Sequence, residues 1–337
     1  MTRQTLKNFA LALSLLGLAL IPSTSSAQVG LASKVSGKRR PSGAAQTASH
    51  QTKTPGASYT YTLLSFPGTF YTYANGINPS ATTAKTEIVG AYNLADGEGG
   101  TGFLAHVSGT KIVAESYEAD NYPHEPPQQA ANGVNDAGQI VGVYVDSSGV
   151  DHGYERSGGK FSTINVPFAG ATATLADGIN NSGEIVGGWW DSSGSHAFTL
   201  IGGAYASFDY PGATFTTALD VNNAGEIVGY YQDTSGVGHG FLLSGGTYTS
   251  IDAPGAVWTN STGINDAGDI VGLYCTTSQC LSTNEGEQGF LLSGGVFATV
   301  AIPGEYGTYL IDINNNGVLL GAYEDAAGLY VSFLATP

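Results

Sequence analysis

The chain has 337 residues, of which 42% are hydrophobic and only 11% are charged, and it is rich in glycine (49) and tyrosine (19). This hydrophobic content excludes a disordered chain, and glycine does not recur at every third position as a collagen requires. Lysine, glutamate and leucine at heptad spacing are too few for a coiled coil. The length suffices for one large domain or two ordinary ones with a sizeable core. The composition therefore favours a globular β protein.

The N-terminus has the pattern of a secretory signal peptide. Arg3 and Lys7 precede a mostly apolar run over residues 10–21, and small residues follow it up to Ala27. The run is shorter than the roughly 18 apolar residues that a membrane-spanning helix needs, and no later stretch reaches that length. We therefore expect cleavage of residues 1–27 and a secreted or periplasmic protein without membrane insertion. A retained N-terminal anchor is the alternative.

Charge divides the remainder of the chain into two parts. Residues 28–58 contain five basic residues and no acidic one among Ser, Ala, Gly and Thr, which predicts a flexible basic linker. Residues 59–337 contain four basic and all 27 acidic residues, a net charge of −23. So acidic a region repels phosphate backbones and anionic lipids, and we expect no nucleic-acid partner. We expect the linker to be solvated, contact with cell-surface polyanions being the alternative.

One sequence pattern recurs six times in residues 59–337. Each copy contains an Asn that ends a short β segment, and the spacings between successive Asn residues are 57, 45, 42, 43 and 49. A turn and a second segment of the type Ile-Val-Gly-x-Tyr follow each Asn. A period near 43 with short β segments is typical of a β-propeller. The six residues are Asn78, Asn135, Asn180, Asn222, Asn265 and Asn314.

Four strands fit into each unit. In the fourth unit they are predicted at residues 216–222, 226–232, 239–243 and 247–252. The breaks between them are rich in Gly, Asn and Ser, which suits hairpins and makes each unit one antiparallel sheet. Residues 253–255, Ala-Pro-Gly, interrupt the ladder because proline lacks the N–H donor. They therefore mark the passage to the next unit.

The two ends of the repeat array complement each other. The last unit has only three strands, ending at residues 330–334, whereas an additional strand at residues 59–66 precedes the first unit. The additional strand can complete the sixth sheet and remove the open edges of a linear array. We predict an all-β fold, a six-bladed β-propeller of four-stranded antiparallel blades closed by the N-terminal strand, as a single monomeric domain over residues 59–337. A β-solenoid is the alternative.

The repeat also resembles a known family. The sequence Ile-Asn-x-x-Gly-x-Ile-Val-Gly-x-Tyr is followed by His-Gly-Phe at His239 or His-Ala-Phe at His196, and then by Gly-Gly. It is similar to the HAF-type extracellular repeats of bacterial secreted proteins, over essentially all of residues 59–337. The resemblance implies an exported repeat protein and no established activity or catalytic residue. Units one, five and six depart from the His position, with Thr101, Gln288 and Tyr330.

Two further positions recur in every unit, and we interpret both as structural. The aromatic residue of the second segment could stack on a sugar, but both faces of a blade pack on neighbours, which favours a core between blades. The glycine two residues earlier is expected to allow close backbone approach between blades. The aromatic residues are Tyr92, Tyr144, Trp189, Tyr231, Tyr274 and Tyr323, and the glycines are Gly90, Gly142, Gly187, Gly229, Gly272 and Gly321.

Metal binding finds little support in the sequence. His152, His196 and His239 begin the third segments of successive units, too far apart to share an ion, so we expect structural hydrogen bonds. Residues 220–225 and 312–317 resemble the start of a calcium loop, but both lack the third acid and the bidentate Glu. Hairpin turns are therefore expected there, calcium is the alternative, and no other cofactor is predicted.

The chemistry-bearing residues predict a disulfide and no catalytic site. Cys275 and Cys280 are the only thiols, and in an exported protein a disulfide is the expected state of such a pair. The sequence has no Gly-x-Ser-x-Gly elbow, no His-Glu-x-x-His zinc helix and no Ser-x-Asp-x-Gly-x-x-Trp box of sialidase-type propellers. We therefore predict no catalytic residues.

Two insertions, residues 118–130 and 275–288, fall in loops that share one face with the connections between blades. Loops above a rigid scaffold are the usual place for a ligand. We predict a secreted non-catalytic binding module for carbohydrate or a cell-surface protein. An extracellular carbohydrate-active hydrolase or lyase with its site on the same face is the alternative. The predicted ligand-binding residues are Trp190, Asp191, Asp146, Asp233, His124 and Glu125.

Overall fold

The computed structural model describes residues 47–48, 59–64, 71–80, 86–93, 100–108, 111–112, 118–119, 122–123, 128–280, 286–302, 304–305, 307–324 and 330–337. The predicted signal peptide, nearly all of the predicted linker, and the candidate residues His124 and Glu125 lie outside these ranges. Within them, no helix has the length and apolar character needed to cross a bilayer.

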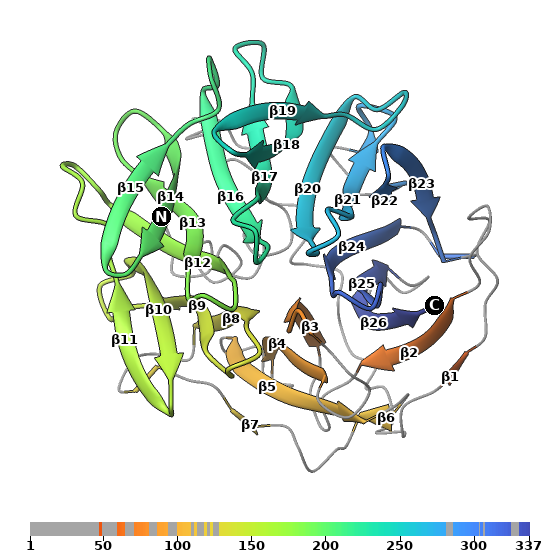
Figure 1. Cartoon of the computed structure of the whole chain (residues 1–337), viewed down its shortest axis with the longest axis horizontal. Helices are drawn as coiled ribbons and strands as arrows, with labels where there is room; N and C mark the ends of the chain where they lie inside the picture. Colours follow the sequence, from red (N-terminus) through yellow and green to blue (C-terminus); the bar gives the residue numbers. More distant parts are fainter. Residues whose placement is uncertain are drawn as a thin grey trace.

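Six antiparallel sheets surround a common axis, which is the predicted six-bladed β-propeller (Figure 1). Blade 1 contains β3 (Tyr71–Ile77), β4 (Thr86–Asn93), β5 (Thr101–Ser108) and β6 (Lys111–Ile112), with β7 (Glu118–Ala119) also paired to β5. Blade 2 contains β8 (Gln129–Val134), β9 (Ile140–Val145), β10 (Asp151–Ser157) and β11 (Lys160–Ile164). Blade 3 contains β12 (Ala173–Ile179), β13 (Ile185–Trp190), β14 (Ser195–Ile201) and β15 (Ala204–Phe208).

The second half of the ring has the same order. Blade 4 contains β16 (Phe215–Val221), β17 (Ile227–Gln232), β18 (Gly238–Ser244) and β19 (Thr247–Ile251), each end within one residue of the prediction. Blade 5 contains β20 (Trp258–Ile264), β21 (Ile270–Cys275), β22 (Gln288–Ser293) and β23 (Val296–Val300). Blade 6 contains β24 (Gly307–Ile313), β25 (Leu319–Glu324) and β26 (Tyr330–Thr336), completed by β2 (Thr60–Leu64).

The N-terminal strand closes the ring, as predicted. β2 pairs with β26 in antiparallel register from Thr60 opposite Thr336 to Leu64 opposite Ser332. Two residues of the predicted linker depart from the expectation, because they form the short strand β1 (Thr47–Ala48) on the outer side of β2. Both ends of the propeller therefore belong to one sheet, and unfolding of either end exposes an edge of the other.

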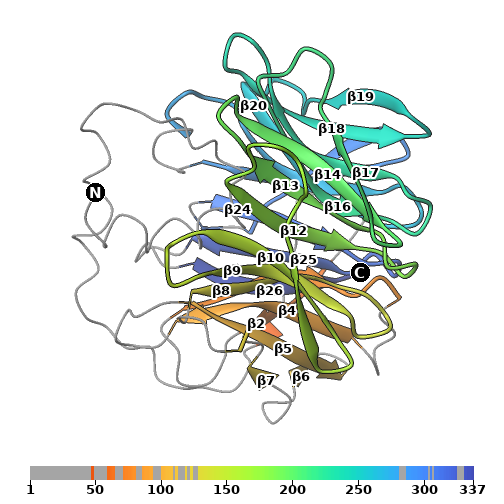
Figure 2. The same cartoon turned by 90° about the vertical axis from the view of Figure 1, so that its left-hand side faces the viewer.

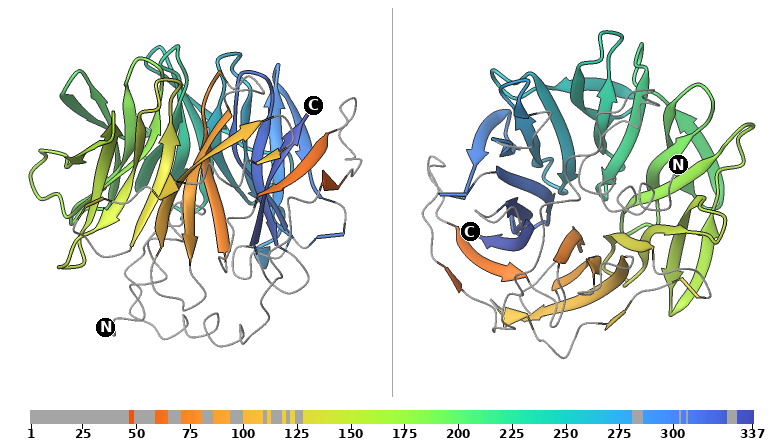
Figure 3. Two further views of the ribbon diagram at one scale, coloured as in Figure 1. Left: turned by 90° about the horizontal axis from the view of Figure 1, so that it is seen from below. Right: turned by 180° about the vertical axis from the view of Figure 1, so that it is seen from behind.

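The strands of each blade run between two faces of the disc (Figures 2 and 3). The turns that join the first strand to the second, and the third to the fourth, lie on one side, which we call the turn face. The loops between the second and third strands and the connections between blades lie on the opposite side, the loop face. Because successive strands are antiparallel, this alternation holds in every blade.

The repeated glycines occupy tight positions inside the blades. A Cβ on Gly229 would lie 2.1 Å from the carbonyl oxygen of Thr217 on β16 and 2.8 Å from the ring of Phe241 on β18. The other five meet the corresponding carbonyl and ring of their own blades. The prediction of close approach between blades was therefore wrong for these glycines. Blades approach one another at a different set, one residue beyond a β-bulge of the innermost strand, at Gly76, Gly133, Gly178 and Gly263.

The repeated aromatic residues form the predicted core. Tyr144, Trp189, Tyr231, Tyr274 and Tyr323 are 5–7% exposed, and Tyr92 is half-buried. In blade 3 Phe168 of the preceding connection packs at a tilt against Trp189, with 5.0 Å between ring centroids, and in blades 2 and 4 a ring from the preceding connection stacks on the repeated aromatic residue. Tyr210 stacks on Tyr231 with 3.6 Å between ring centroids, and Tyr122 stacks on Tyr144 at 4.0 Å. The core is thereby continuous from one blade to the next.

The Asn that defines the repeat holds its own turn and binds the next blade. In blade 4, Asn222 Oδ1 accepts hydrogen bonds from the backbone N–H groups of Ala224 and Glu226, both at 3.0 Å. Its Nδ2 donates to the carbonyl oxygen of Asn265 in blade 5 at 3.1 Å. The same link runs from Asn135 to Asn180, from Asn180 to Asn222 and from Asn265 to Asn314, at 3.0, 3.0 and 3.4 Å.

A second belt of hydrogen bonds circles the turn face one residue further along the chain. The backbone N–H of Asn181 donates to Asn223 Oδ1 at 2.8 Å, that of Asn223 donates to Asp266 Oδ1 at 2.9 Å, and that of Asp266 donates to Asn315 Oδ1 at 2.8 Å. Asn315 N–H continues to the carbonyl oxygen of Pro79 in blade 1 at 2.7 Å. The belt lies at the surface, whereas the six repeated Asn residues are buried.

We predict that Asn222→Ala lowers the free energy of unfolding by about 3 kcal/mol, because it leaves the N–H groups of Ala224 and Glu226 without their acceptor and removes the hydrogen bond to blade 5. Asn223→Ala, one residue away in the exposed belt, is the matched control and should cost about 1 kcal/mol or less. Urea unfolding of the two variants and the wild type gives both values. Equal losses for the two variants would contradict the role assigned to Asn222.

Candidate functional site

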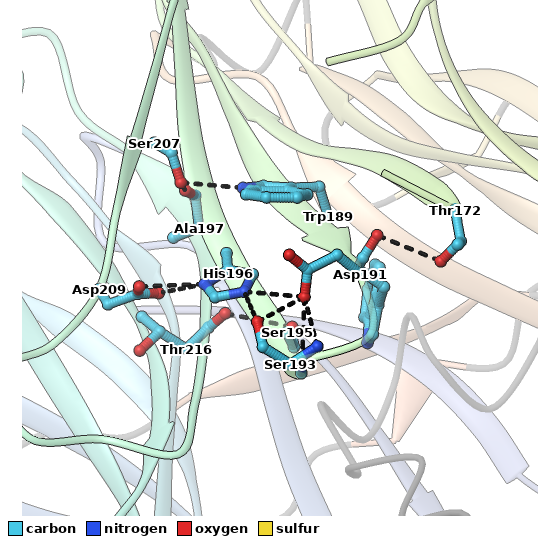
Figure 4. Close-up of polar contacts among 12 residues, drawn as sticks. Thr172, Trp189, Asp191, Ser193, Ser195, His196, Ala197, Ser207, Asp209 and Thr216 are labelled. Carbon is cyan, nitrogen blue, oxygen red and sulfur yellow. Dashed lines mark hydrogen bonds and ion pairs between the residues drawn. The ribbon is translucent and has the colours of Figure 1, made fainter. Parts of the chain in front are cut away.

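Blades 2, 3 and 4 share an arrangement at the loop face that we call the His–Asx clamp. In blade 3, Nδ1 of His196 lies 3.0 Å from Asp209 Oδ2, and Nε2 lies 3.4 Å from Asp191 Oδ1 (Figure 4). The imidazole stacks on Trp189 with 4.6 Å between ring centroids. The indole Nε1 of Trp189 in turn donates to Ser207 Oγ at 3.0 Å. The histidine thus ties the second-to-third-strand loop to the end of the outermost strand.

The other two clamps repeat these contacts with the equivalent residues. His152 lies 2.8 Å from Asn165 Oδ1 and 3.2 Å from Asp146 Oδ2. His239 lies 2.6 Å from Asp252 Oδ1 and 3.7 Å from Asp233 Oδ2. Each histidine has its own partners within one blade, which confirms the predicted structural hydrogen bonds.

Three of the candidate ligand-binding residues belong to these clamps. Asp191 accepts hydrogen bonds from Ser193 and from the backbone of Gly194, and the bond from the Ser193 hydroxyl is the main cause that lowers the pKa of its carboxyl. Hydrogen bonds from backbone N–H groups, foremost those of Val150 and Val237, lower the pKa of Asp146 and Asp233. All three carboxylates are ionised at neutral pH and shape their own loops. The structure brings each to a histidine and not to the other two.

Trp190 lies beside the clamp of blade 3 but packs in another direction. Its half-buried indole contacts a small cluster of buried residues, Ala91, Ala130, Val143 and Leu175, from blades 1 to 3. One apolar side of the ring is therefore used between blades. The loop face retains Trp190 and the three aspartates as candidates in neighbouring blades.

The predicted disulfide is present between Cys275 and Cys280, and both residues are buried. The carboxyl of Glu287 lies within 4.8 Å of the two sulfurs, and burial raises its pKa to about 7. Because both sulfurs are used in the disulfide, this cluster offers no thiolate to a metal ion.

A groove of about 490 Å³ runs along the outer wall between blades 4 and 5. Leu242, Thr249, Ser250 and Asp252 of blade 4 and Ile270, Leu292 and Phe297 of blade 5 are among its lining residues. This groove was not predicted from the sequence. A signal is nevertheless present in the repeat, because Ala253 occupies the position of Tyr210 in the preceding connection.

Because Ala253 has a methyl group where Tyr210 has a ring, the Phe297 side chain remains at the groove. In blade 4 the equivalent residue, Tyr248, packs edge-on against Tyr210 at 5.4 Å between centroids. Among the described residues, Phe297 has a ring contact only with Phe290, at 5.4 Å, on its own sheet. Phe297 is half-buried and lines the groove. It is the aromatic surface most available to a ligand there.

A second cavity of about 60 Å³ lies on the axis, lined by the innermost strands of all six blades. Five polar residues, Asn75, Asn132, Asp177, Asp220 and Asp312, form what we call the channel girdle. Asn132 Nδ2 donates to Asp177 Oδ1 at 3.0 Å. Asp220 and Asp312 each accept a hydrogen bond of 2.8 Å from the backbone of the next blade, from Ile264 and Ile77.

Asp220 and Asp312 begin the two segments that resembled calcium loops. Both carboxyls line the axial cavity, and the residues that follow form the expected hairpin turns, with Gly225 and Gly317 donating to the carbonyls of Asn222 and Asn314 at 3.0 Å. Burial raises the pKa of Asp177 to about 7 and of Asp220 to about 6. Burial, followed by the charge of Asp220, raises the pKa of Asp312 well above its usual range.

The comparisons with known proteins give the fold and no family. No protein-family model matches the chain, and no curated protein matches it. TolB from Acinetobacter baumannii is similar over 80% of this chain, with 12% identity and a TM-score of 0.50, and the match spans 65% of TolB, less than two thirds of its length.

Two proteins of other organisms are also similar. A triple arginine-to-alanine mutant of AofleA from Arthrobotrys oligospora matches 85% of this chain and 89% of its own, with 12% identity and a TM-score of 0.50. A fucose-specific lectin from Aleuria aurantia matches 77% of this chain and 90% of its own, with 12% identity and a TM-score of 0.47. At 12% identity, the likenesses to TolB and to the AofleA mutant, with TM-scores of 0.50, establish the fold alone.

We predict that His196→Ala lowers the free energy of unfolding by about 1 kcal/mol, because it removes two hydrogen bonds to carboxylates at a partly exposed site. Amide hydrogen exchange of Ser193 and Gly194 should accelerate, since Asp191 loses its anchor. His196→Gln is the matched control, because Gln288 occupies this position in blade 5, and it should lose less. Unchanged exchange in the alanine variant would contradict the clamp.

The raised pKa of Asp177 predicts a pH-dependent stability. The carboxyl titrates near 3.8 when unfolded and near 7 when folded, so the folded state binds the extra proton and stability falls as pH rises between these values. Asp177→Asn should therefore melt about 2–4 °C above the wild type at pH 8 in metal-free buffer. Near pH 4 the two should melt together. A variant less stable at pH 8 would refute the assignment, and Asn75 and Asn132 show that the fold accepts Asn there.

Proposed function

We propose that the protein is an exported, non-catalytic binding module for carbohydrate, with its ligand in the groove between blades 4 and 5. The observation that carries the proposal is the combination of Phe297 with Asp252, Ser250 and Thr249 in one groove of about 490 Å³. A sugar presents C–H groups on its ring faces and hydroxyls at its edge, which suit an aromatic ring beside a carboxylate and hydroxyls. Export rests on the signal-peptide pattern and the HAF resemblance.

The His–Asx clamp of blade 4 orients the Asp252 carboxylate at the groove. The Asp252 side chain is 50% exposed, its Oδ1 lies 2.6 Å from Nδ1 of His239, and its Oδ2 accepts a hydrogen bond from Ser250 Oγ at 2.8 Å. The carboxylate is thus oriented before a ligand arrives, which lowers the entropy that binding costs. In this proposal the repeated clamp positions a binding group.

The loop face remains a second predicted location for the ligand. Trp190 and Asp191 lie there with Asp146 and Asp233, but the aspartates already accept hydrogen bonds from their own loops. The groove has the most exposed of these carboxylates, 50% for Asp252 against 20–35% for the three aspartates of the loop face, beside the ring of Phe297, and we favour it for that reason. A hydrolase or lyase finds less support in the groove, because Asp252 is the single carboxylate among its described lining residues and glycoside hydrolysis uses two.

We predict that the full chain binds a subset of soluble polysaccharides or arrayed glycans, and that Phe297→Ala weakens this binding at least about tenfold. Asp252→Asn should weaken it comparably, because the amide loses the charged acceptor. Tyr205→Ala changes the equivalent residue of blade 3 and is the matched control expected to retain affinity. Titration followed by intrinsic fluorescence or calorimetry gives the constants.

Each other outcome has a definite meaning for the proposal. Loss of affinity in Trp190→Ala or Asp191→Ala, with Phe297→Ala unchanged, would move the site to the loop face. Turnover of a bound polysaccharide would favour the hydrolase or lyase. Failure of the folded chain to bind any glycan would refute carbohydrate as the ligand and favour a cell-surface protein.

A further inference from the structure

The channel girdle contains more acceptors than donors. The described residues supply five donors to its three carboxyls: Asn132 Nδ2 to Asp177, Val221 and Ile264 N–H to Asp220, and Ile77 and Ile313 N–H to Asp312. All five donors are neutral. No Lys, Arg or His is among the described residues that line the cavity. The three girdle carboxyls, and Asp266 that also lines the cavity, therefore have no positively charged partner among the described lining residues.

Two amide oxygens add to this excess independently of the carboxyls. Asn260 is 1% exposed and Asn75 is 8% exposed, and both line the cavity. The Oδ1 atom of each accepts no hydrogen bond from the described residues. A buried carbonyl oxygen without a donor costs about 1–3 kcal/mol, so native structures pair such atoms with water or an ion.

We propose that the axial cavity binds one partly hydrated hard divalent cation, Ca²⁺ or Mg²⁺, through the channel girdle and the amide oxygens of Asn75 and Asn260. All available groups are oxygen acceptors, the ligands that these two ions prefer. A cavity of about 60 Å³ accommodates an ion with a few waters, since one water-sized probe needs about 10–15 Å³.

The spacing of the carboxyls explains why the ion keeps water. Among the described residues, three ligand atoms of His, Cys, Asp or Glu side chains approach within 4.8 Å of one another only at Cys275, Cys280 and Glu287, away from the girdle. The three girdle carboxyls are further apart and reach a common ion partly through bound water. Such mixed coordination is usual for Mg²⁺ and for weaker Ca²⁺ sites.

The ion has a structural consequence at the seam where the ring closes. Asn314 Nδ2 has no partner among the described residues, so the amide-to-carbonyl link that runs from blade 2 to blade 6 is not continued from blade 6 to blade 1. Asp312 instead accepts the N–H of Ile77 across this seam. A cation beside Asp312 keeps that carboxyl ionised and strengthens its hydrogen bond, so it stabilises ring closure.

Protons compete with the ion for the same oxygens. The titratable residues among the described lining of the cavity are Asp177, Asp220, Asp266, Asp312 and Tyr309. A proton and a cation cannot occupy the same carboxylate oxygen, so the binding experiment is run at pH 8.

Equilibrium dialysis of the EDTA-treated full chain against ⁴⁵Ca²⁺, and separately against Mg²⁺ with elemental analysis, tests the proposal at pH 8. We expect one ion per chain below about 1 mM free ion, the range of extracellular calcium modules, and a higher melting temperature with the ion. Asp177→Asn combined with Asp312→Gly should weaken binding at least about tenfold. Gly occupies the Asp312 position in four other blades, so the fold tolerates it.

Asp209→Asn is the matched control, because it changes an acid outside the channel to the residue that blade 2 has at Asn165. It should bind the ion like the wild type. If the double variant fails to fold, Asp177→Asn alone carries the same test. No ion bound at about 1 mM and pH 8, or equal binding by the channel variant, overturns the proposal. Phe297→Ala should retain the ion, which separates this result from that of the glycan experiment.

Discussion

The structure depends on one side-chain amide used repeatedly. A propeller blade can stand beside its neighbour in many registers, because apolar packing between sheets is not directional. The repeated Asn removes this freedom, since Asn222 binds its own turn through Oδ1 and the backbone of blade 5 through Nδ2. No other side chain of that size offers an acceptor and a two-proton donor at once. The Asn therefore sets both the shape of the turn and the angle between blades.

Departures from the repeat mark the candidate sites. Four blades have Gly after the bulge, and Asp220 and Asp312 in the other two place carboxyls on the axis. Ala253 in place of an aromatic residue leaves the Phe297 side chain at a groove. The ring tolerates such local changes, because each alters one interface and leaves intact the other links between blades 2 and 6.

The fold was predictable because the sequence is periodic. The candidate sites were harder to predict, because they lie where single residues depart from the repeat. The spacing of the six Asn residues and the additional strand before the first unit were sufficient for blade number and closure, with strand ends in blade 4 correct to one residue. The sequence pattern could not predict which neighbour approaches Gly229. A repeated glycine indicates a close backbone contact, but it does not indicate whether the carbonyl belongs to the same sheet or to the next one. Asp191 was predicted to bind a ligand because it lies in a loop of the loop face. Its hydrogen bond from Ser193 could not be predicted, because that bond depends on the three-dimensional shape of the loop. Phe297 was missed because its place at the groove depends on another segment of the chain. The connection before blade 5 has Ala253 where the connection before blade 4 has Tyr210, the ring that packs on Tyr248.

A crystal structure of the protein grown with Ca²⁺ and a glycan that it binds is the most direct test of the claim that broken repeat positions are the ligand sites. The account predicts a sugar ring against Phe297 beside Asp252, and a cation on the axis near Asp177 and Asp312. A sugar bound at the loop face, over loops that follow the repeat, together with an axial cavity that contains only water, would contradict it.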